Sequence, residues 1–320
     1  MEQIATGIDI GGTNTVLGLV NREGTVIDSF SMPTRTGEDY KIYLNELCDA
    51  IVKLINPVKE RYEVTGIGIG APNGNYYNGT IEFAPNLKFK GIVPVVDFLK
   101  EHLDYANIVL TNDANAAAMG EMIYGGAKGM KNFIMITLGT GVGSGIVVNG
   151  EMVYGHDGFA GEIGHTIYDP QGRQCGCGRR GCLETYASAP GIKRTVFELL
   201  AISNLDSELR NFTWHTLSAK SIDEAARKGD EVAIKAFDKT GEVLGIKLAD
   251  AIAHTSPEAI FLFGGLAQAG ELIFDPVKKH MEQNLLNIYK NKVKLLPSEL
   301  PPGEAAILGA SALVWKETGE

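Results

Sequence analysis

The sequence predicts an α/β fold made of two similar halves around a cleft. The chain of 320 residues exceeds the size at which a single hydrophobic core usually stops growing. Strand-like and helix-like patterns alternate along it, which indicates parallel strands joined by crossover helices. A strand, a glycine turn and a returning strand occur at the N-terminus and again near residue 140, which indicates an internal duplication.

The first half opens with an antiparallel meander. Apolar and β-branched runs predict three strands, at 4–10, 15–20 and 25–31, joined by the turns Gly11-Gly12 and Asn21-Arg22-Glu23-Gly24. Further patterns predict helices near 40–54, 95–103 and 114–124 and strands at 65–71 and 107–112. An Ala-rich pattern at 303–315 predicts a last helix, of the kind that often packs back on the first domain in duplicated folds.

The internal repeat suggests where the domains meet. Residues 137–149 align with residues 9–21 without gaps, so that Gly139 matches Gly11 and Asn149 matches Asn21. The match is short and degenerate, so chance is the alternative to duplication. We expect an N-terminal domain of residues 1–115, completed by a C-terminal helix at 303–320, and a second domain of residues 116–302.

Composition argues against several classes of protein. Hydrophobic residues make up 44% and charged residues 21%, as in a globular protein. The start lacks a basic region followed by a long apolar stretch, and no apolar run approaches the roughly 18 to 20 residues that span a bilayer. We therefore expect a soluble cytoplasmic protein with no membrane partner. The net charge of -10 argues against a nucleic-acid partner, so we expect backbone amides to hold any bound phosphate.

Three glycine turns together could line one nucleotide site. In the run Asp9-Ile-Gly-Gly-Thr-Asn14, glycine lets the backbone approach a phosphate, and Asp9 is placed to hold a hydrated magnesium ion. By itself the run also fits a tight hairpin turn. The Walker spacing G-x-x-x-x-G-K-[ST] is not found, and no dinucleotide G-x-G-x-x-G opens a helix after its strand. The candidate nucleotide-site residues of the three turns are Asp9, Gly11, Gly12, Thr13, Asn14, Gly139, Thr140, Gly141, Gly264 and Gly265.

Asp113 lies where the predicted strand 107–112 meets the next helix. In one interpretation it is a helix N-cap, whose oxygen accepts hydrogen bonds from free backbone amides. In the other it is a general base, the carboxylate that a kinase needs beside the attacking hydroxyl. The helix N-terminus would keep it ionised, and the two roles can coexist.

One histidine and three cysteines have the spacing of a metal site. His165 is followed by Cys175, Cys177 and Cys182 in a Gly-rich stretch, which fits a tetrahedral zinc ion with three thiolates and one imidazole. The alternatives are buried thiols beside an ordinary histidine, or a redox switch. Four protein ligands would close the coordination shell, so the zinc would be structural and not catalytic.

Together these motifs resemble the ROK family of repressors, open reading frames and sugar kinases. The similarity covers the DIGGT loop, the pair Asn112-Asp113, a Gly-rich signature at 136–165 and a CGCGxxGCxE zinc loop, which here lies within 165–184. The glycine turns are similar to the phosphate and adenosine loops of the superfamily of actin, heat-shock chaperones and sugar kinases. The resemblance implies the duplicated actin-like, ribonuclease H-like ATPase fold, with two domains around a cleft.

The resemblance also implies an activity: ATP-dependent phosphorylation of a hexose, with glucose converted to glucose 6-phosphate and Asp113 as general base. It implies ATP, Mg²⁺ and a structural Zn²⁺ as cofactors, and a homodimer. His165 would contact both the zinc and the sugar, while the glycine loops would lie on the other side of the transferred phosphoryl group from Glu184. The implied sugar ligands are Asn86, Asn112, Asp113, Glu162, His165 and Glu184.

Other functions are also compatible with the sequence. The run Ala71-Pro72-Asn73-Gly74-Asn75 departs from the Pro-Gly pair of many glucose-phosphorylating members, so kinases of N-acetylhexosamines, glucosamine, fructose or mannose are alternatives. A sugar-responsive repressor would need a helix-turn-helix domain ahead of the DIGGT loop, where only eight residues precede Asp9. A sugar sensor without turnover is opposed by the presence of Asp113 together with the phosphate loops.

Overall fold

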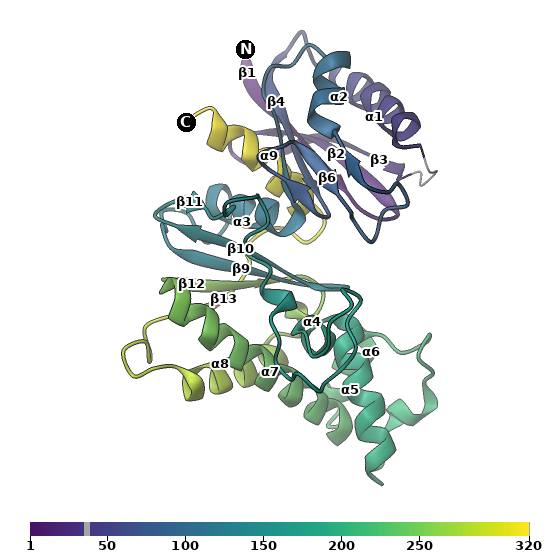
Figure 1. Cartoon of the computed structure of the whole chain (residues 1–320), viewed down its shortest axis with the longest axis vertical. Coiled ribbons are helices and arrows are strands. Elements are labelled where there is room, and N and C mark those ends of the chain that lie inside the picture. The colour runs from purple at the N-terminus through teal and green to yellow at the C-terminus, as the bar shows by residue number, and fades with distance from the viewer. Residues whose placement is uncertain (35–38, 320) are drawn as a thin grey trace.

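The computed structural model describes residues 1–34 and 39–319, and its strands form two five-stranded sheets placed one above the other (Figure 1). The first sheet has the order β3-β2-β1-β4-β8, with strands Val26–Pro33, Asn14–Asn21, Glu2–Ile10, Tyr62–Ala71 and Ile108–Asn112. The second has the order β11-β10-β9-β12-β13, with strands Glu151–Met152, Val142–Val148, Phe133–Leu138, Ala259–Phe263 and Lys294–Pro297. A small third sheet holds Gly74–Asn75 (β5), Thr80–Glu82 (β6) and Ile92–Val93 (β7).

The two large sheets share one topology. In each, three successive strands form an antiparallel meander, and two later strands add in parallel beside the first of them. This confirms the internal duplication. The gapless alignment is wrong in one respect: Ile10 pairs with Thr15, whereas Leu138 pairs with Val142, so the second turn is one residue shorter. A change of one residue in a turn shifts the pairing of the whole returning strand.

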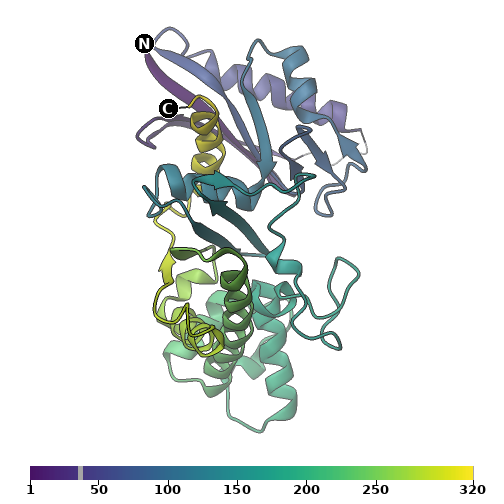
Figure 2. The ribbon, with the colours of Figure 1, turned by 60° about the vertical axis from the view of Figure 1, so that its left-hand side comes forward.

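Helices cover both sheets and also lie between them (Figures 1 and 2). The outer face of the first sheet packs on α1 (Tyr40–Ile55) and α2 (Val95–His102). Between the sheets lie α3 (Asp113–Ile123) and α9 (Ala305–Glu317). The far face of the second sheet is covered by α4 (Glu184–Ala187), α5 (Ala189–Ile202), α6 (Ala219–Arg227), α7 (Glu231–Thr255) and α8 (Glu271–Asn284). No helix in the described ranges is both long and apolar enough to cross a membrane.

Alternation along the central strands explains how the first sheet is buried on both faces. On β1, Ile4 and Ile8 belong to the core with α1, whereas Gly7 faces α9. On β4, every second residue from 66 to 70 is glycine, and the isoleucines between them enter the same core as those of β1. Period-2 alternation thus gives each strand one apolar face and an opposite face that carries its glycines, one on β1 and three on β4.

The glycine face lets α9 lie directly on the backbone of the sheet. A Cβ atom at Gly7 would be 2.1 Å from the carbonyl oxygen of Ile307. At Gly68 it would be 1.9 Å from the carbonyl oxygen of Ala310. Any side chain at these positions would therefore push the helix away.

Helix α3 is in contact with both sheets. A Cβ atom at Gly70 of the first sheet would be 3.2 Å from the Cβ of Ala116, and one at Gly145 of the second sheet 2.6 Å from the Cβ of Ala118. The Ala-rich sequence of α3 allows this close approach on two sides. The start of α3, at Asp113, is therefore held at the junction of the two halves.

Replacing Gly68 by alanine tests this packing. Because the new methyl group would overlap the backbone of α9, we expect Gly68→Ala to lower the free energy of unfolding by about 1–3 kcal/mol. Urea denaturation followed by the fluorescence of the buried Trp315 would measure it. Gly303→Ala is the control, since a Cβ atom there meets nothing within 4 Å. Equal stability of the two variants would contradict the proposed backbone contact.

Candidate active site

The two glycine turns of the repeat are hairpin turns at the same end of equivalent strands. Gly11 donates its backbone N–H to the backbone carbonyl oxygen of Asn14 at 3.0 Å. Gly139 likewise donates to the backbone carbonyl oxygen of Gly141 at 3.1 Å. Thr13, Asn14 and Thr140 are exposed at these turns. The hairpin interpretation is confirmed, and it leaves the exposed turn atoms accessible to a ligand.

The third glycine turn packs against the second. Gly264 has a φ angle of +102°, which glycine adopts at little cost. A Cβ atom there would be 2.6 Å from the carbonyl oxygen of Leu138, which also accepts a hydrogen bond from the N–H of Leu266 at 3.3 Å. The structure therefore brings the turns at 139–141 and 264–265 together.

Asp9 and Asp113 lie close to each other beside Gly70. A Cβ atom at Gly70 would be 3.9 Å from Oδ1 of Asp9 and 3.8 Å from the Cα of Asp113. Burial, and then the charge of Asp113, raise the pKa of Asp9 to about 6. The pKa of Asp113 is also raised by the surrounding protein, and its own N–H and that of Ala114 partly oppose this. Asp113 is surrounded by protein atoms on most sides. Its side chain is nevertheless exposed to solvent, so a ligand can reach it.

The N-cap of α3 is Asn112 and not Asp113. Oδ1 of Asn112 accepts the N–H of Asn115 at 2.7 Å, whereas the carboxylate of Asp113 accepts its own N–H and the adjacent N–H of Ala114, the latter at 2.8 Å. The interpretation of Asp113 as the cap is therefore wrong. Because the cap uses the oxygen of Asn112, a hydrogen bond from this residue to a ligand would come from its NH2 group.

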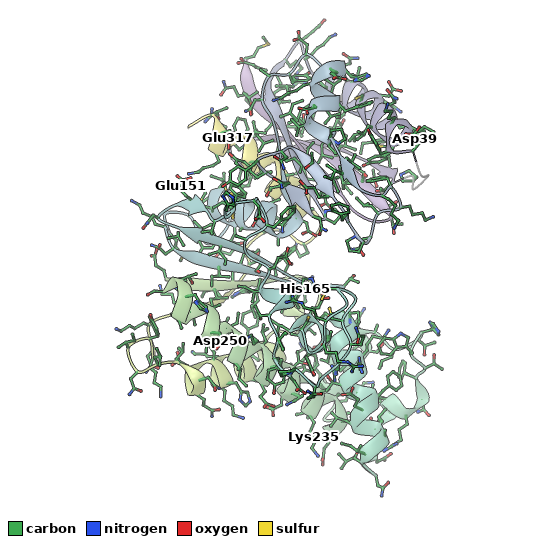
Figure 3. All side chains as sticks on the ribbon, viewed as in Figure 1. Asp39, Glu151, His165, Lys235, Asp250 and Glu317 are labelled. Atoms are coloured by element: carbon green, nitrogen blue, oxygen red, sulfur yellow. The ribbon has the colours of Figure 1, made fainter. Side chains whose placement is uncertain are left out.

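Glu162 interacts electrostatically with Asp113, His165 and Glu184. Glu162 precedes the short helix η1 (Ile163–His165), and Glu184 is the first residue of α4. The surrounding protein raises the pKa of Glu162; His165 lowers it, while the charges of Asp113 and Glu184 raise it further. Oε1 of Glu184 lies 3.8 Å from Nδ1 of His165. His165 lies where the second half faces the first (Figure 3).

Glu184 also contacts the second glycine turn. Its Oε2 would be 2.7 Å from a Cβ atom at Gly141, and the N–H of Ala189, in the next helix, donates to the oxygen of Gly139 at 2.9 Å. The expectation that Glu184 stands apart from the glycine loops is therefore wrong. The reason is that α4 starts with Glu184, shortly after the last predicted metal ligand Cys182, and the chain then meets the second glycine turn at Ala189.

Asn86 reaches the site from the first half. It is exposed, and its backbone rests on the first glycine turn, where a Cβ atom at Gly12 would be 2.9 Å from the oxygen of Asn86. Asn86 thus lies beside the phosphate-loop candidate, while Glu162 and Glu184 come from the second half. The predicted sugar ligands therefore come from both halves of the chain.

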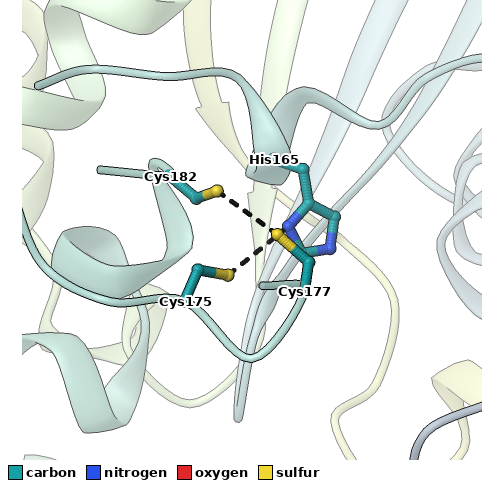
Figure 4. A group of neighbouring side chains, drawn as sticks. All are labelled: His165, Cys175, Cys177 and Cys182. Carbon is teal, nitrogen blue, oxygen red and sulfur yellow. Dashed lines mark hydrogen bonds between the residues drawn. The ribbon is translucent and has the colours of Figure 1, made fainter. Parts of the chain in front are cut away.

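The four predicted metal ligands converge (Figure 4). One donor atom from each of His165, Cys175, Cys177 and Cys182 can be chosen so that all lie within 4.8 Å of one another. Sγ of Cys177 is 3.6 Å from Sγ of Cys182, and Sγ of Cys175 is 3.8 Å from Nδ1 of His165. Tetrahedral zinc with bonds of about 2.3 Å separates two sulfurs by about 3.8 Å, so this donor set fits zinc.

Two supporting residues were not predicted from the sequence. Ser144 donates to the oxygen of Gly161 and accepts the N–H of Ile163 at 3.2 Å, and so holds both neighbours of Glu162. The buried Arg173 donates to the oxygen of Thr185 at 2.7 Å, next to Glu184. Ser144 could have been suspected because it lies within the Gly-rich signature, but nothing local distinguishes Arg173.

Comparison with known proteins gives matches over nearly the whole chain. Residues 5–317 match the ROK family. A glucokinase of Halalkalibacterium halodurans is 36% identical over 315 residues, covering 97% of this chain and 94% of that protein. A xylose repressor of Caldicellulosiruptor bescii is 30% identical over 313 residues, covering 96% of this chain and 77% of the repressor. The crystal structure of a ROK family glucokinase from Streptomyces griseus in complex with glucose and AMPPNP is 33% identical, with a TM-score of 0.79, covering 98% of this chain and 99% of that one. This likeness confirms the predicted fold.

The metal centre can be tested by its zinc content. We expect about one zinc per chain, because four ligands complete one tetrahedral shell. Cys182→Ser should lose the metal. Cys48→Ser should retain it, because Cys48 is buried on α1 and lies far in sequence from the three clustered cysteines. Elemental analysis of purified protein would measure both. A folded Cys182→Ser variant with a full complement of zinc would rule out the site.

The raised pKa of Asp9 predicts a pH-dependent cost to stability. Its pKa in the folded protein, about 6, lies above the ordinary value of 3.8, so its ionisation destabilises the fold as the pH rises through this window. Asp9→Asn should therefore raise the free energy of unfolding at pH 8 by about 1–2 kcal/mol, with the gain disappearing near pH 4. Chemical denaturation at both pH values would measure it. Asp104→Asn, at an exposed position, controls for the change in net charge. If the free energy of unfolding at pH 8 rises no more in Asp9→Asn than in Asp104→Asn, the raised pKa of Asp9 is contradicted.

Proposed function

The chain belongs to the ROK family, and from that membership and the geometry of its site we propose that it is an ATP-dependent kinase that converts glucose to glucose 6-phosphate. The observation that supports this most directly is the position of Asp113. It is accessible to solvent, lies beside Asp9, which precedes the first glycine turn in the chain, and interacts with Glu162 of the second half. A general base, a phosphate loop and acceptors for hydroxyl groups are thus within one site.

Asp113 would act on the attacking hydroxyl of the hexose. Its carboxylate orients that hydroxyl and accepts its proton as the oxygen attacks the γ-phosphorus of ATP. A pKa above the ordinary range makes the carboxylate a stronger proton acceptor, provided that it is ionised at the working pH. The remainder of the catalysis is positioning and neutralisation of charge.

Backbone amides of the glycine turns would hold the phosphates. None of the residues proposed for the nucleotide site is basic, so hydrogen bonding by N–H groups must supply much of the recognition. Asp9, at the end of β1, would hold Mg²⁺ through its water shell, and the bound ion would neutralise phosphate charge. The neighbouring turns at 139–141 and 264–265 would bind the rest of the nucleotide.

The sugar would be held by carboxylates and amides from both halves. Glu162 and Glu184 can accept hydrogen bonds from hydroxyl groups, and Asn86 and the NH2 of Asn112 can donate them. Nδ1 of His165 faces the thiols, so we propose that this atom binds zinc and that Nε2 contacts the sugar. The zinc would then be structural: it sets the tautomer and orientation of His165.

The loop that departs from the Pro-Gly pair is compatible with glucose. Asn73 has a φ angle of +51°, and asparagine tolerates this left-handed region better than other residues with a side chain. Pro72-Asn73 can therefore form a turn with a left-handed second residue, although asparagine stands where a Pro-Gly pair has glycine. Kinases of N-acetylhexosamines, glucosamine, fructose or mannose are the alternative activities, and a non-catalytic relative of the repressors is a further one.

We further propose the division into domains expected from the sequence. Residues 1–115 together with 303–320 would form one domain and residues 116–302 the other, because α9 packs on the glycine face of the first sheet. A cytoplasmic homodimer is proposed from the family resemblance.

Asp113→Asn tests the general base. The amide cannot accept the proton, so turnover should fall about 10²- to 10⁴-fold, while glucose binding and folding persist because Asn112 still caps α3. In the unmodified protein, turnover should fall as the pH drops through the raised pKa of Asp113, since only the carboxylate is active. ADP release measured over a panel of hexoses would give both results and identify the preferred sugar. Near-normal turnover in the variant would refute the role of Asp113.

A further inference from the structure

The hairpin of β5 and β6 contacts a loop of the second half that leads into the site. This loop, residues 154–161, begins after β11 and ends immediately before Glu162. Oγ of Ser144 on β10 fixes its far end by donating to the oxygen of Gly161. The placement of Glu162 therefore depends on how the rest of this loop is held.

Asn75 holds the loop from the opposite side. It is 1% exposed, and its Nδ2 donates to the backbone oxygen of Asp157 at 2.9 Å and to Oε1 of Glu82 at 3.1 Å. Its Oδ1 accepts the N–H groups of Tyr77 at 3.0 Å and Asn78 at 3.2 Å. Both N–H donors and both lone pairs of the amide are thus used. A buried amide satisfied in this way has one strongly preferred orientation.

Neighbouring side chains strengthen the same contact. The rings of Tyr76 and Tyr154 stack with centroids 3.9 Å apart and planes within 3°. The hydroxyl of Tyr77 donates to the oxygen of Gly155 at 2.8 Å. At Gly158, where φ is +91°, a Cβ atom would be 2.5 Å from Oδ1 of Asn75. The loop thus approaches Asn75 more closely than a residue with a side chain would allow.

The hairpin itself continues into the first half of the site. Four residues beyond Glu82 the chain reaches Asn86, whose backbone rests on Gly12 of the first glycine turn. Glu82 is tied to the hairpin because its Oε1 also accepts the hydroxyl of Thr80 at 2.8 Å. Asn75 therefore connects the segment that carries Asn86 to the segment that carries Glu162.

We propose that Asn75 is a positioning residue for the sugar: its amide sets the position of Glu162 relative to Asn86 across the two halves. This inference rests on the proposed kinase function. Asn75 does not touch the reacting atoms; it acts through Glu162. Its loss should weaken binding of the hexose more than binding of ATP or the chemical step.

Asn75→Asp tests the proposal, and Asn78→Asp is its matched control. The first variant keeps the oxygen that accepts from Tyr77 and Asn78 but loses the donor to Asp157. The control makes the same chemical change on the same hairpin: Asn78 also donates to Glu82, at 3.3 Å, but within the described residues it makes no hydrogen bond to the loop 154–161. Both variants thus place an extra carboxylate near Glu82, and only one cuts the link.

We expect Asn75→Asp to raise the KM for glucose about 10-fold, the equivalent of one or two hydrogen bonds, with the KM for ATP changed less than about twofold. Tyr77→Phe, at an exposed position, should raise the KM for glucose about two- to fivefold. Asn78→Asp should resemble the unmodified protein. Hydrogen–deuterium exchange in residues 154–161 should become faster in the first two variants only.

An unchanged KM for glucose in Asn75→Asp, or equal effects of Asn75→Asp and Asn78→Asp, would overturn the proposal. If Asn75→Asp does not fold, Tyr77→Phe decides, and normal KM and exchange in that variant would overturn it. The unmodified protein separates the two hypotheses. If the unmodified protein shows no hexose-dependent ADP release, the kinase function itself is refuted. If the unmodified protein is active and Asn75→Asp has the same KM for glucose, only the positioning role is refuted.

Discussion

The architecture depends on contact between backbones at the glycine face of the first sheet. Side chains normally hold a helix well away from a sheet, but the glycines of β1 and β4 let α9 approach until its carbonyl groups touch the strands. The same absence of a side chain, at Gly70, brings the start of α3 next to Asp9. One alternating pattern therefore serves both the packing of the core and the assembly of the site.

Helix α3 transmits this constraint to the second sheet. Its alanines contact glycines of β4 on one side and of β10 on the other, so the helix has little freedom to shift relative to either sheet. Asp113 is the first residue of that helix, and the cap at Asn112 fixes its backbone. The position of Asp113, the proposed general base, is thus fixed by the close packing of α3 against both sheets.

The carboxyl groups of the site are clustered and surrounded by protein, and both conditions make their ionised forms less stable. Asp9, Asp113 and Glu162 all have raised pKa values, in each case mainly because protein surrounds the carboxyl group. The negative charge of Asp113 further raises the pKa of Asp9, and the charges of Asp113 and Glu184 further raise that of Glu162. A cation or a row of hydroxyl groups would relieve that repulsion, which agrees with the proposed ligands. Glu184 joins the same cluster of carboxylates. A zinc ion held by His165 and the three cysteines would fix the irregular segment 165–182, which leads directly to the start of α4 at Glu184.

The sequence alone determined the features that depend on local pattern. Alternation predicted the meander and the parallel strands, the repeated glycine turns predicted the duplication, and the spacing of His165 and three cysteines predicted a cluster that the structure brings together. Tertiary structure decided the rest. Asn112 and Asp113 are both good capping residues, so only the path of the chain selects which one caps α3. The contacts of Glu184 with Gly141 and of Asn75 with the loop before Glu162 join segments far apart in sequence, and no local propensity records such distances.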